Sequence, residues 1–253
     1  MIFVPMHDEN LGCSSFIVAD EVTTQGIIVD PLGALGAEAY VLAAAELGVS
    51  VRGVIETHVH ADHASAARDV ADALHVPIYL SHQAPAQFPF EPVHDGQVLD
   101  LGSLKVTFWE TPGHTPDSIS VLLTDLTRGD QPWAILSGDS LFVGDVGRPD
   151  LANPTDEGID AASRAQFQTV HRIMQLPDFT ELWPAHYGAS PCGGLYMSRK
   201  PSSTIGYERH FNRFIRIQDE AEFMDQQKRL LKPPPENAAQ IRSQNLGLAE
   251  SVI

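Results

Sequence analysis

Cysteine is scarce in this chain, and basic residues are few. The 253 residues include two cysteines, Cys13 and Cys192, which lie far apart in sequence and form no disulfide framework. Such cysteine usage is typical of a reducing compartment, so we expect a cytoplasmic protein. Asp and Glu number 33 against 16 Lys and Arg, which gives a formal net charge of -17. A surface this acidic disfavours nucleic acid and anionic membranes as partners.

Long apolar runs are also missing. No stretch of about 18 apolar residues occurs that would indicate a membrane-spanning helix. Residues 1–8 lack the basic segment and the long apolar core of a signal peptide. Hydrophobic residues nevertheless make up 43% of the chain. That content suffices for one large α/β domain, or two small ones, with a sizeable core.

Histidine, in contrast, is concentrated in one short segment. Residues 57–63 read Thr-His-Val-His-Ala-Asp-His and contain three imidazoles and one carboxylate. The apolar, β-branched run at 49–56 predicts a buried strand before them, and the helix formers at 64–74 predict a helix after them. The histidine segment is therefore expected on a loop between a strand end and a helix start, where ligand sites commonly form in layered α/β proteins.

Three further polar residues follow predicted strands. His114 comes after a strand expected at 104–109, and Asp139 and His186 come after shorter ones. If these strand ends converge with the histidine segment, the side chains share one site, since neutral imidazole and carboxylate bind zinc, iron or manganese. The candidate metal ligands are His58, His60, Asp62, His63, His114, Asp139 and His186.

Outside these motifs the pattern alternates short strands and helices. Apolar runs at 16–19 and 26–29 predict a hairpin, and the residues at 37–47 and 161–176 predict helices. This order of strands and helices indicates an α/β protein.

The C-terminal part of the chain differs from the rest. Beyond Tyr207 it reads as helical, with Asp219 and Glu222 spaced like a capping pair. Three consecutive prolines then end the helical pattern, and the residues after them are polar and weakly patterned. We therefore assign residues 1–232 to the folded domain and residues 233–253 to a C-terminal tail or linker.

The histidine segment, with His114, Asp139 and His186 following in order, resembles the metallo-β-lactamase superfamily. The resemblance covers roughly residues 10–210. It implies a four-layer αββα fold, in which two mixed β-sheets pack face to face with helices outside. It also implies that the metal site lies at one edge of this sandwich.

Two metal arrangements remain open within the superfamily. The glyoxalase II arrangement holds two zinc ions and implies thioester hydrolysis by a metal-bound hydroxide. Its first zinc would bind His58, His60 and His114, and its second Asp62, His63 and His186, with Asp139 bridging. The alternative holds one Fe(II) per chain and leaves positions open for O₂ and substrate, while the other candidates orient ligands and bound water. Its ligands would be His58, His114 and Asp139.

The sequence around the candidate ligands favours the iron arrangement. Residues 138–151, which contain Val-Gly-Arg-Pro-Asp-Leu, are similar to the persulfide dioxygenase branch and differ from glyoxalase II. Residues 184–194 and 202–209 resemble members of that branch in which the dioxygenase domain is fused to rhodanese domains. The resemblance implies that a low-molecular-weight thiol persulfide, O₂ and water give sulfite and the free thiol, in sulfide detoxification.

The same resemblance bears on partners. No rhodanese module fits after Tyr207, so the chain is either a stand-alone relative or one domain of a longer fusion. A rhodanese-type sulfurtransferase is therefore a candidate partner, and the resemblance also implies a homo-oligomer. A third interpretation is a metal-binding sulfur-carrier module that acts with a rhodanese partner.

Three residues beside the candidate ligands are candidates for catalysis. Cys192 lies in a Ser-Pro-Cys-Gly-Gly loop. The resemblance to the fused relatives implies that it carries persulfide sulfur and that thiosulfate is a product. The alternative is that Cys192 is a small buried residue without a role in catalysis. Tyr187 would offer a hydroxyl to the substrate sulfur or simply pack. Arg148 would pair with a carboxylate such as Asp150 at the edge of the site, or form an ion pair away from substrate. Cys13 is expected to pack.

Overall fold

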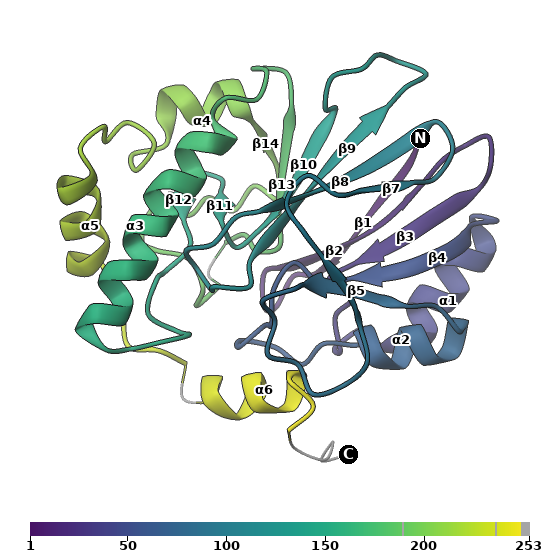
Figure 1. Ribbon diagram of the computed structural model, residues 1–253, viewed down its shortest axis with the longest axis horizontal. Helices are drawn as coiled ribbons and strands as arrows, with labels where there is room; N and C mark the ends of the chain where they lie inside the picture. The colour runs from purple at the N-terminus through teal and green to yellow at the C-terminus, as the bar shows by residue number, and fades with distance from the viewer. Residues whose placement is uncertain (189, 236, 249–253) are drawn as a thin grey trace.

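The chain folds into four layers, with two β-sheets face to face and helices on both outer surfaces (Figure 1). The computed structural model describes residues 1–188, 190–235 and 237–248. Its architecture confirms the αββα fold that the resemblance implies.

The first sheet is mixed. Its strands, in spatial order, are β1 (Ile2–Asp8), β2 (Cys13–Ala19), β3 (Gln25–Val29), β4 (Ser50–Ile55), β5 (Ile78–Ser81) and β6 (Glu91–Val93). β1, β2 and β3 pair antiparallel, which confirms the hairpin predicted from the runs at 16–19 and 26–29. β3 to β6 pair parallel, so the carboxyl end of β4 leads into the histidine segment at one edge of the sheet.

The second sheet is mixed as well. Its strands, in spatial order, are β14 (Ser203–Thr204), β13 (Glu181–Pro184), β10 (Ala134–Gly138), β9 (Ile119–Asp125), β8 (Leu104–Glu110) and β7 (Val98–Asp100). β10 and β13 are parallel neighbours, so their carboxyl ends bring Asp139 and His186 to the same edge. A short hairpin of β11 (Leu141–Phe142) and β12 (Asp145–Val146) follows β10.

The core lies between the sheets. In β2, Phe16 and Val18 point into this space, where they join Leu136 of β10 in one apolar cluster. The alternate residues point the other way: Ile17 and Ile135 pack under the outer helices of their respective sheets. Because both faces of these strands are covered, the sequence shows continuous apolar runs there rather than alternation.

Five helices cover the sheets. Helices α1 (Gly36–Glu46) and α2 (Ala67–Leu74) cover the first sheet, and α3 (Asp156–Ile173), α4 (Ile205–Phe211) and α5 (Glu220–Arg229) cover the second (Figure 1). Asp219 accepts a hydrogen bond from Glu222 N at 2.9 Å, which confirms the predicted cap of α5. Among the described helices, none is long and apolar enough to cross a membrane.

Strand β1 lies where the sequence predicts no strand. Its sequence, Ile-Phe-Val-Pro-Met-His-Asp, lacks the alternation of apolar and polar residues that marks a half-buried strand, although all seven residues are partly buried. β1 forms by pairing with β2 at the edge of the first sheet.

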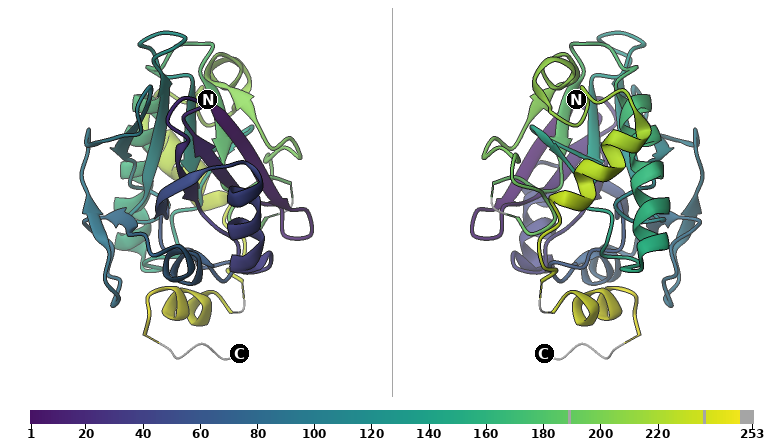
Figure 2. Two further views of the ribbon diagram at one scale, coloured as in Figure 1. Left: turned by 90° about the vertical axis from the view of Figure 1, so that its right-hand side faces the viewer. Right: turned by 90° about the vertical axis from the view of Figure 1, so that its left-hand side faces the viewer.

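The segment interpreted as a tail or linker contains a helix. α6 (Ala238–Asn245) lies across the loop end of the sandwich (Figure 2). Asn245 Nδ2 donates to the carbonyl oxygens of His60 and His63, both at 2.9 Å, and Asn245 Oδ1 accepts from Ser65 N at 3.0 Å. Residues 238–245 are therefore packed structure and not a free tail, whereas the domain boundary after residue 232 stays a prediction.

Candidate metal centre

Three predicted ligands converge at the loop edge of the sandwich. His58, His114 and Asp139 follow β4, β8 and β10, and each is about 1% exposed. Asp139 Oδ2 lies 3.7 Å from His58 Nε2 and 3.4 Å from His114 Nε2. Donor atoms that each lie about 2.1 Å from one ion are roughly 3–3.5 Å apart. His58 Nε2 and Asp139 Oδ2 are buried without a hydrogen-bond partner, so this group fits a metal ion.

Neighbouring groups fix how these ligands point. His114 Nδ1 lies 2.8 Å from the carbonyl oxygen of Arg148, so Nδ1 carries the proton and leaves Nε2 free for a metal. His58 Nδ1 contacts Thr57 Oγ1 at 3.1 Å, which turns its Nε2 toward Asp139. Asp139 follows Gly138, which has a φ of 54° and packs so closely on Thr57 that an added Cβ would lie 2.7 Å from Thr57 Oγ1. Glycine is needed at this turn for both reasons.

The protonation states of these three residues suit metal binding. Burial and the neighbouring His60 lower the pKa of His58 well below its usual value, and burial lowers the pKa of His114. Burial acts to raise the pKa of Asp139, but His186 and the other imidazoles around it hold that pKa below its usual value. Neutral imidazoles and an ionised carboxylate are the forms that bind metals.

His60 belongs to a different group of residues. Its Nε2 donates to Asp30 Oδ1 at 3.3 Å and lies 3.9 Å from Glu56 Oε2. Asp30 also accepts hydrogen bonds from the backbone and hydroxyl of Thr57, at 2.7 and 2.8 Å. The ring of His60 lies 4.2 Å from the ring of His58, and its Nδ1 is buried without a partner.

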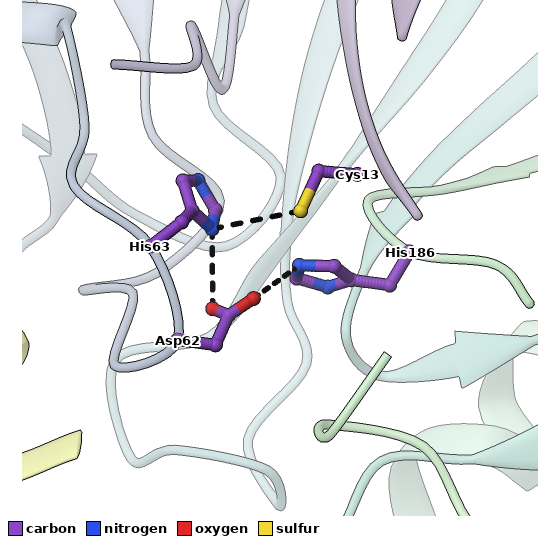
Figure 3. A group of neighbouring side chains, drawn as sticks. All are labelled: Cys13, Asp62, His63 and His186. Atoms are coloured by element: carbon purple, nitrogen blue, oxygen red, sulfur yellow. Dashed lines mark hydrogen bonds and ion pairs between the residues drawn. The ribbon is translucent and has the colours of Figure 1, made fainter. Parts of the chain in front are cut away.

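The other three candidates form a second cluster (Figure 3). Asp62 accepts from His63 Nδ1 at 3.2 Å, and its other oxygen lies 2.7 Å from His186 Nε2. Cys13, for which packing is expected, joins them, with Sγ 4.0 Å from His63 Nδ1. His186 Nδ1 lies 2.6 Å from Asp139 Oδ1, so His186 links this cluster to the first one.

Cys192 is fully buried beside both clusters. Its Sγ lies within 4.8 Å of ligand atoms of Asp139 and His186. Burial, together with the charges of Asp62 and Asp139, raises the pKa of the Cys192 thiol well above its usual value. The structure thus places this thiol near the candidate ligands, and its proposed role in carrying sulfur stays a prediction.

Arg148 donates four hydrogen bonds to protein partners. Nε and Nη2 donate to the two carboxylate oxygens of Asp150 at 2.7 and 2.8 Å, and the guanidinium also donates to the carbonyl oxygens of Pro191 and Lys232. The side chain is 7% exposed. Arg148 therefore joins three segments around the site, and its backbone carbonyl orients His114. This is the Asp150 ion pair that the sequence predicts.

Tyr187 packs beside β1 and borders the surface. Its ring packs edge-on against His7, with ring centroids 5.4 Å apart, and it borders a surface pocket of about 370 Å³ with Arg199. Its hydroxyl role stays a prediction.

Several residues that hold the histidine segment escape sequence reasoning. Asp117 accepts from Val59 N at 2.8 Å, and Arg242 donates to the carbonyl oxygen of Val59 at 3.2 Å. Asp30 has a signal that could have been used, because it directly follows the predicted strand at 26–29, as the ligands follow theirs. Asn245 and Arg242 have none, since they arrive from a distant helix.

Substitution Asn245→Ala tests the support that α6 gives to the histidine segment. It leaves two buried carbonyl oxygens unpaired, so we expect the free energy of unfolding to fall by about 1–3 kcal/mol. Because these carbonyl groups belong to the histidine segment, we also expect metal affinity to fall about 10–100-fold. Thermal unfolding and metal titration measure these effects. Gln240→Ala, at an exposed position of the same helix, is the control and should change neither.

The fold and these clusters define a metal-binding protein built on an αββα sandwich. The chain belongs to the metallo-beta-lactamase superfamily, whose family model matches residues 9–186. The members of this superfamily are mostly enzymes.

Particular relatives cover most of the chain. The structure of a metallo-beta-lactamase from Staphylococcus aureus is 32% identical, with a TM-score of 0.89 over 99% of this chain and 73% of that one. ETHE1 from Myxococcus xanthus is 25% identical, with a TM-score of 0.82 over 98% of this chain and all of that one. An uncharacterised protein of Mycobacterium tuberculosis is 28% identical over 232 residues, which are 81% of this chain and 93% of its own.

Proposed function

We propose that this chain is a non-haem iron(II) persulfide dioxygenase, which oxidises a low-molecular-weight thiol persulfide with O₂ to sulfite and the free thiol. The compact group of His58, His114 and Asp139 carries the proposal, because ligand atoms of these three buried residues lie within 4.8 Å of one another. Two imidazoles and one carboxylate are the ligand set of non-haem iron oxygenases, and three ligands leave coordination positions open. Bound iron would supply adjacent positions for the persulfide sulfur and O₂.

The segment at 138–151 supports the same proposal. It delivers Asp139 through the turn at Gly138, and the carbonyl oxygen of Arg148 orients His114. The segment that resembles persulfide dioxygenases therefore positions two of the three proposed ligands. The likeness to ETHE1 over nearly the whole chain is compatible with this proposal.

A cavity beside His114 offers room for the thiol part of the substrate. It measures about 270 Å³ and lies between the loop at 112–116, the start of the loop after Arg148, and the first turns of α3. Pro112, Pro116 and Ala162 are among its largely apolar walls. Apolar walls near a few polar groups are typical of small-molecule sites. We propose that the thiol carrier lies here, with its sulfur toward His114.

Substitution Ala162→Phe tests this cavity. The added ring would fill space that the substrate needs, so we expect KM for the persulfide to rise about 10-fold or more, corresponding to about 1.4 kcal/mol of lost binding. Iron content should not change. Ala45→Phe, on an exposed position of α1, is the matched control. An unchanged KM in Ala162→Phe would place the substrate elsewhere.

One observation favours a second candidate function. Asp62, His63 and His186 lie close enough together to hold another ion beside the first group. A dinuclear zinc enzyme of the glyoxalase II type would hydrolyse thioesters, with Asp139 between the two metals. Such an enzyme needs no oxygen.

Product analysis tests the proposed function. Iron-loaded protein is mixed with glutathione persulfide or coenzyme A persulfide in buffer that contains O₂. We expect sulfite, free thiol and oxygen uptake in equal amounts, and the faster substrate identifies the thiol class. Absence of sulfite in a sample with iron bound would contradict the proposal.

A further inference from the structure

We propose that Cys13, Asp62, His63 and His186 form a closed four-ligand zinc site beside the three-ligand group. This inference goes beyond the persulfide dioxygenase function and does not depend on it. It differs from the glyoxalase II arrangement because Cys13 supplies a thiolate and closes the site.

The four side chains have the composition and burial of a zinc site. Cys13 and His186 are 0% exposed, and His63 is 6% exposed. One ligand atom of each residue lies within 4.8 Å of the others. A thiolate and a carboxylate offset the two charges of the ion, and sulfur with imidazole selects zinc over magnesium or calcium. Four protein ligands complete a tetrahedron and leave no position for substrate.

The backbone holds Cys13 beside His186. The two residues form an isolated antiparallel bridge between β2 and the loop after β13. Tyr187 N donates to Gly12 O at 2.8 Å, and Ser14 N donates to Ala185 O at 2.7 Å. Gly12 has a φ of 66°, and a Cβ added there would lie 2.1 Å from Tyr187 O. Only glycine permits this approach, so the thiol is fixed beside the imidazole before any metal binds.

His186 has one ring nitrogen for each neighbouring group. Its Nδ1 lies 2.6 Å from Asp139 Oδ1, and its buried Nε2 lies 2.7 Å from Asp62 Oδ2. With zinc on Nε2, the Nδ1 proton would be donated to Asp139, as zinc-bound histidines commonly donate to a carboxylate. The zinc would thereby help to orient Asp139, whose Oδ2 faces the other group.

Cobalt substitution in the full chain tests the site without any activity assay. The variant His114→Ala disables the three-ligand group and leaves all four proposed zinc ligands. We expect one Co²⁺ per chain, with tetrahedral visible bands and a thiolate-to-cobalt band in the near ultraviolet. Adding Cys13→Ser should remove the near-ultraviolet band and weaken zinc binding more than about 100-fold, since even hydrogen-bond partners of ligands contribute about 10–100-fold. Adding Cys192→Ser is the matched control and should leave both unchanged.

Thiol alkylation tests the proposal in a chain with no substitution. Iodoacetamide is added during partial unfolding of zinc-loaded and metal-free protein, and the modified cysteines are identified by mass spectrometry. Zinc should slow alkylation of Cys13 at least about 10-fold and should protect Cys192 much less. A near-ultraviolet band that survives Cys13→Ser, or zinc protection of Cys192 alone, would overturn the proposal. Neither result would bear on oxygen uptake, so this proposal and the proposed function can fail separately.

Discussion

The Asp139→Ala protein should bind no iron and should lose persulfide-dependent oxygen uptake by about 10³-fold or more. Asp139 supplies the only carboxylate of the three-ligand group, and its oxygens reach both His58 and His186. A bound metal ion stabilises the transition state by several kcal/mol. A loss of about 4 kcal/mol corresponds to a rate that is about 10³-fold lower. Metal analysis and an oxygen electrode measure the two losses on one sample.

The control for this variant is Asp130→Ala, which removes an exposed carboxylate from a loop. It should keep iron and full oxygen uptake. Iron retained at one per chain in Asp139→Ala, with activity preserved, would mean that Asp139 is not a ligand.

Arg148→Ala should lower the free energy of unfolding by about 3 kcal/mol, because it leaves the carboxylate of Asp150, which is only 11% exposed, without its partner. The carbonyl oxygens of Pro191 and Lys232 lose their donor as well. Denaturant unfolding of the metal-free protein measures this effect without any contribution from bound metal.

Arg164→Ala is the matched control for Arg148→Ala. Arg164 forms an exposed ion pair with Glu220, with side-chain exposures of 57% and 37%, so its loss should cost less than about 1 kcal/mol. If Arg148→Ala unfolds like the wild type and instead raises KM for the persulfide, its guanidinium contacts substrate. The interpretation that Arg148 only holds neighbouring segments in place would then be wrong.

The sequence predicts where the ligands lie because each of them is close in sequence to the strand that positions it. Each of His58, His114, Asp139 and His186 lies within four residues of the end of a strand that reads as an apolar run in the sequence. Strands that end at one edge of a sandwich bring such residues together, whatever the details of the loops. The same logic predicts the hairpin of β2 and β3 and the cap of α5.

The parts that escaped prediction depend on contacts between distant segments. Cys13 reaches His186 only because β2 meets the end of β13 through a bridge of one residue pair. α6 contacts the histidine segment through polar groups of Asn245 and Arg242. Because these contacts are polar, the sequence of α6 shows no apolar stripe that would indicate a packed helix. The contact between His60 and Asp30 also escaped prediction, although Asp30 directly follows the predicted strand at 26–29.

Partners remain at the stage of prediction. A rhodanese-type sulfurtransferase, a homo-oligomer and a role for Cys192 in forming thiosulfate all follow from the resemblance. The burial of Cys192 means that sulfur transfer to another protein would require the loop at 190–194 to move.

Oxygen uptake by one iron-loaded sample, with a persulfide and then with a thioester, tests the central claim most directly. The protein is loaded anaerobically, and bound iron is measured before the assay. We expect uptake to begin only when the persulfide is added, and no hydrolysis of lactoyl-glutathione. Thioester hydrolysis without oxygen uptake, in a sample that holds iron, would contradict a persulfide dioxygenase and favour the hydrolase.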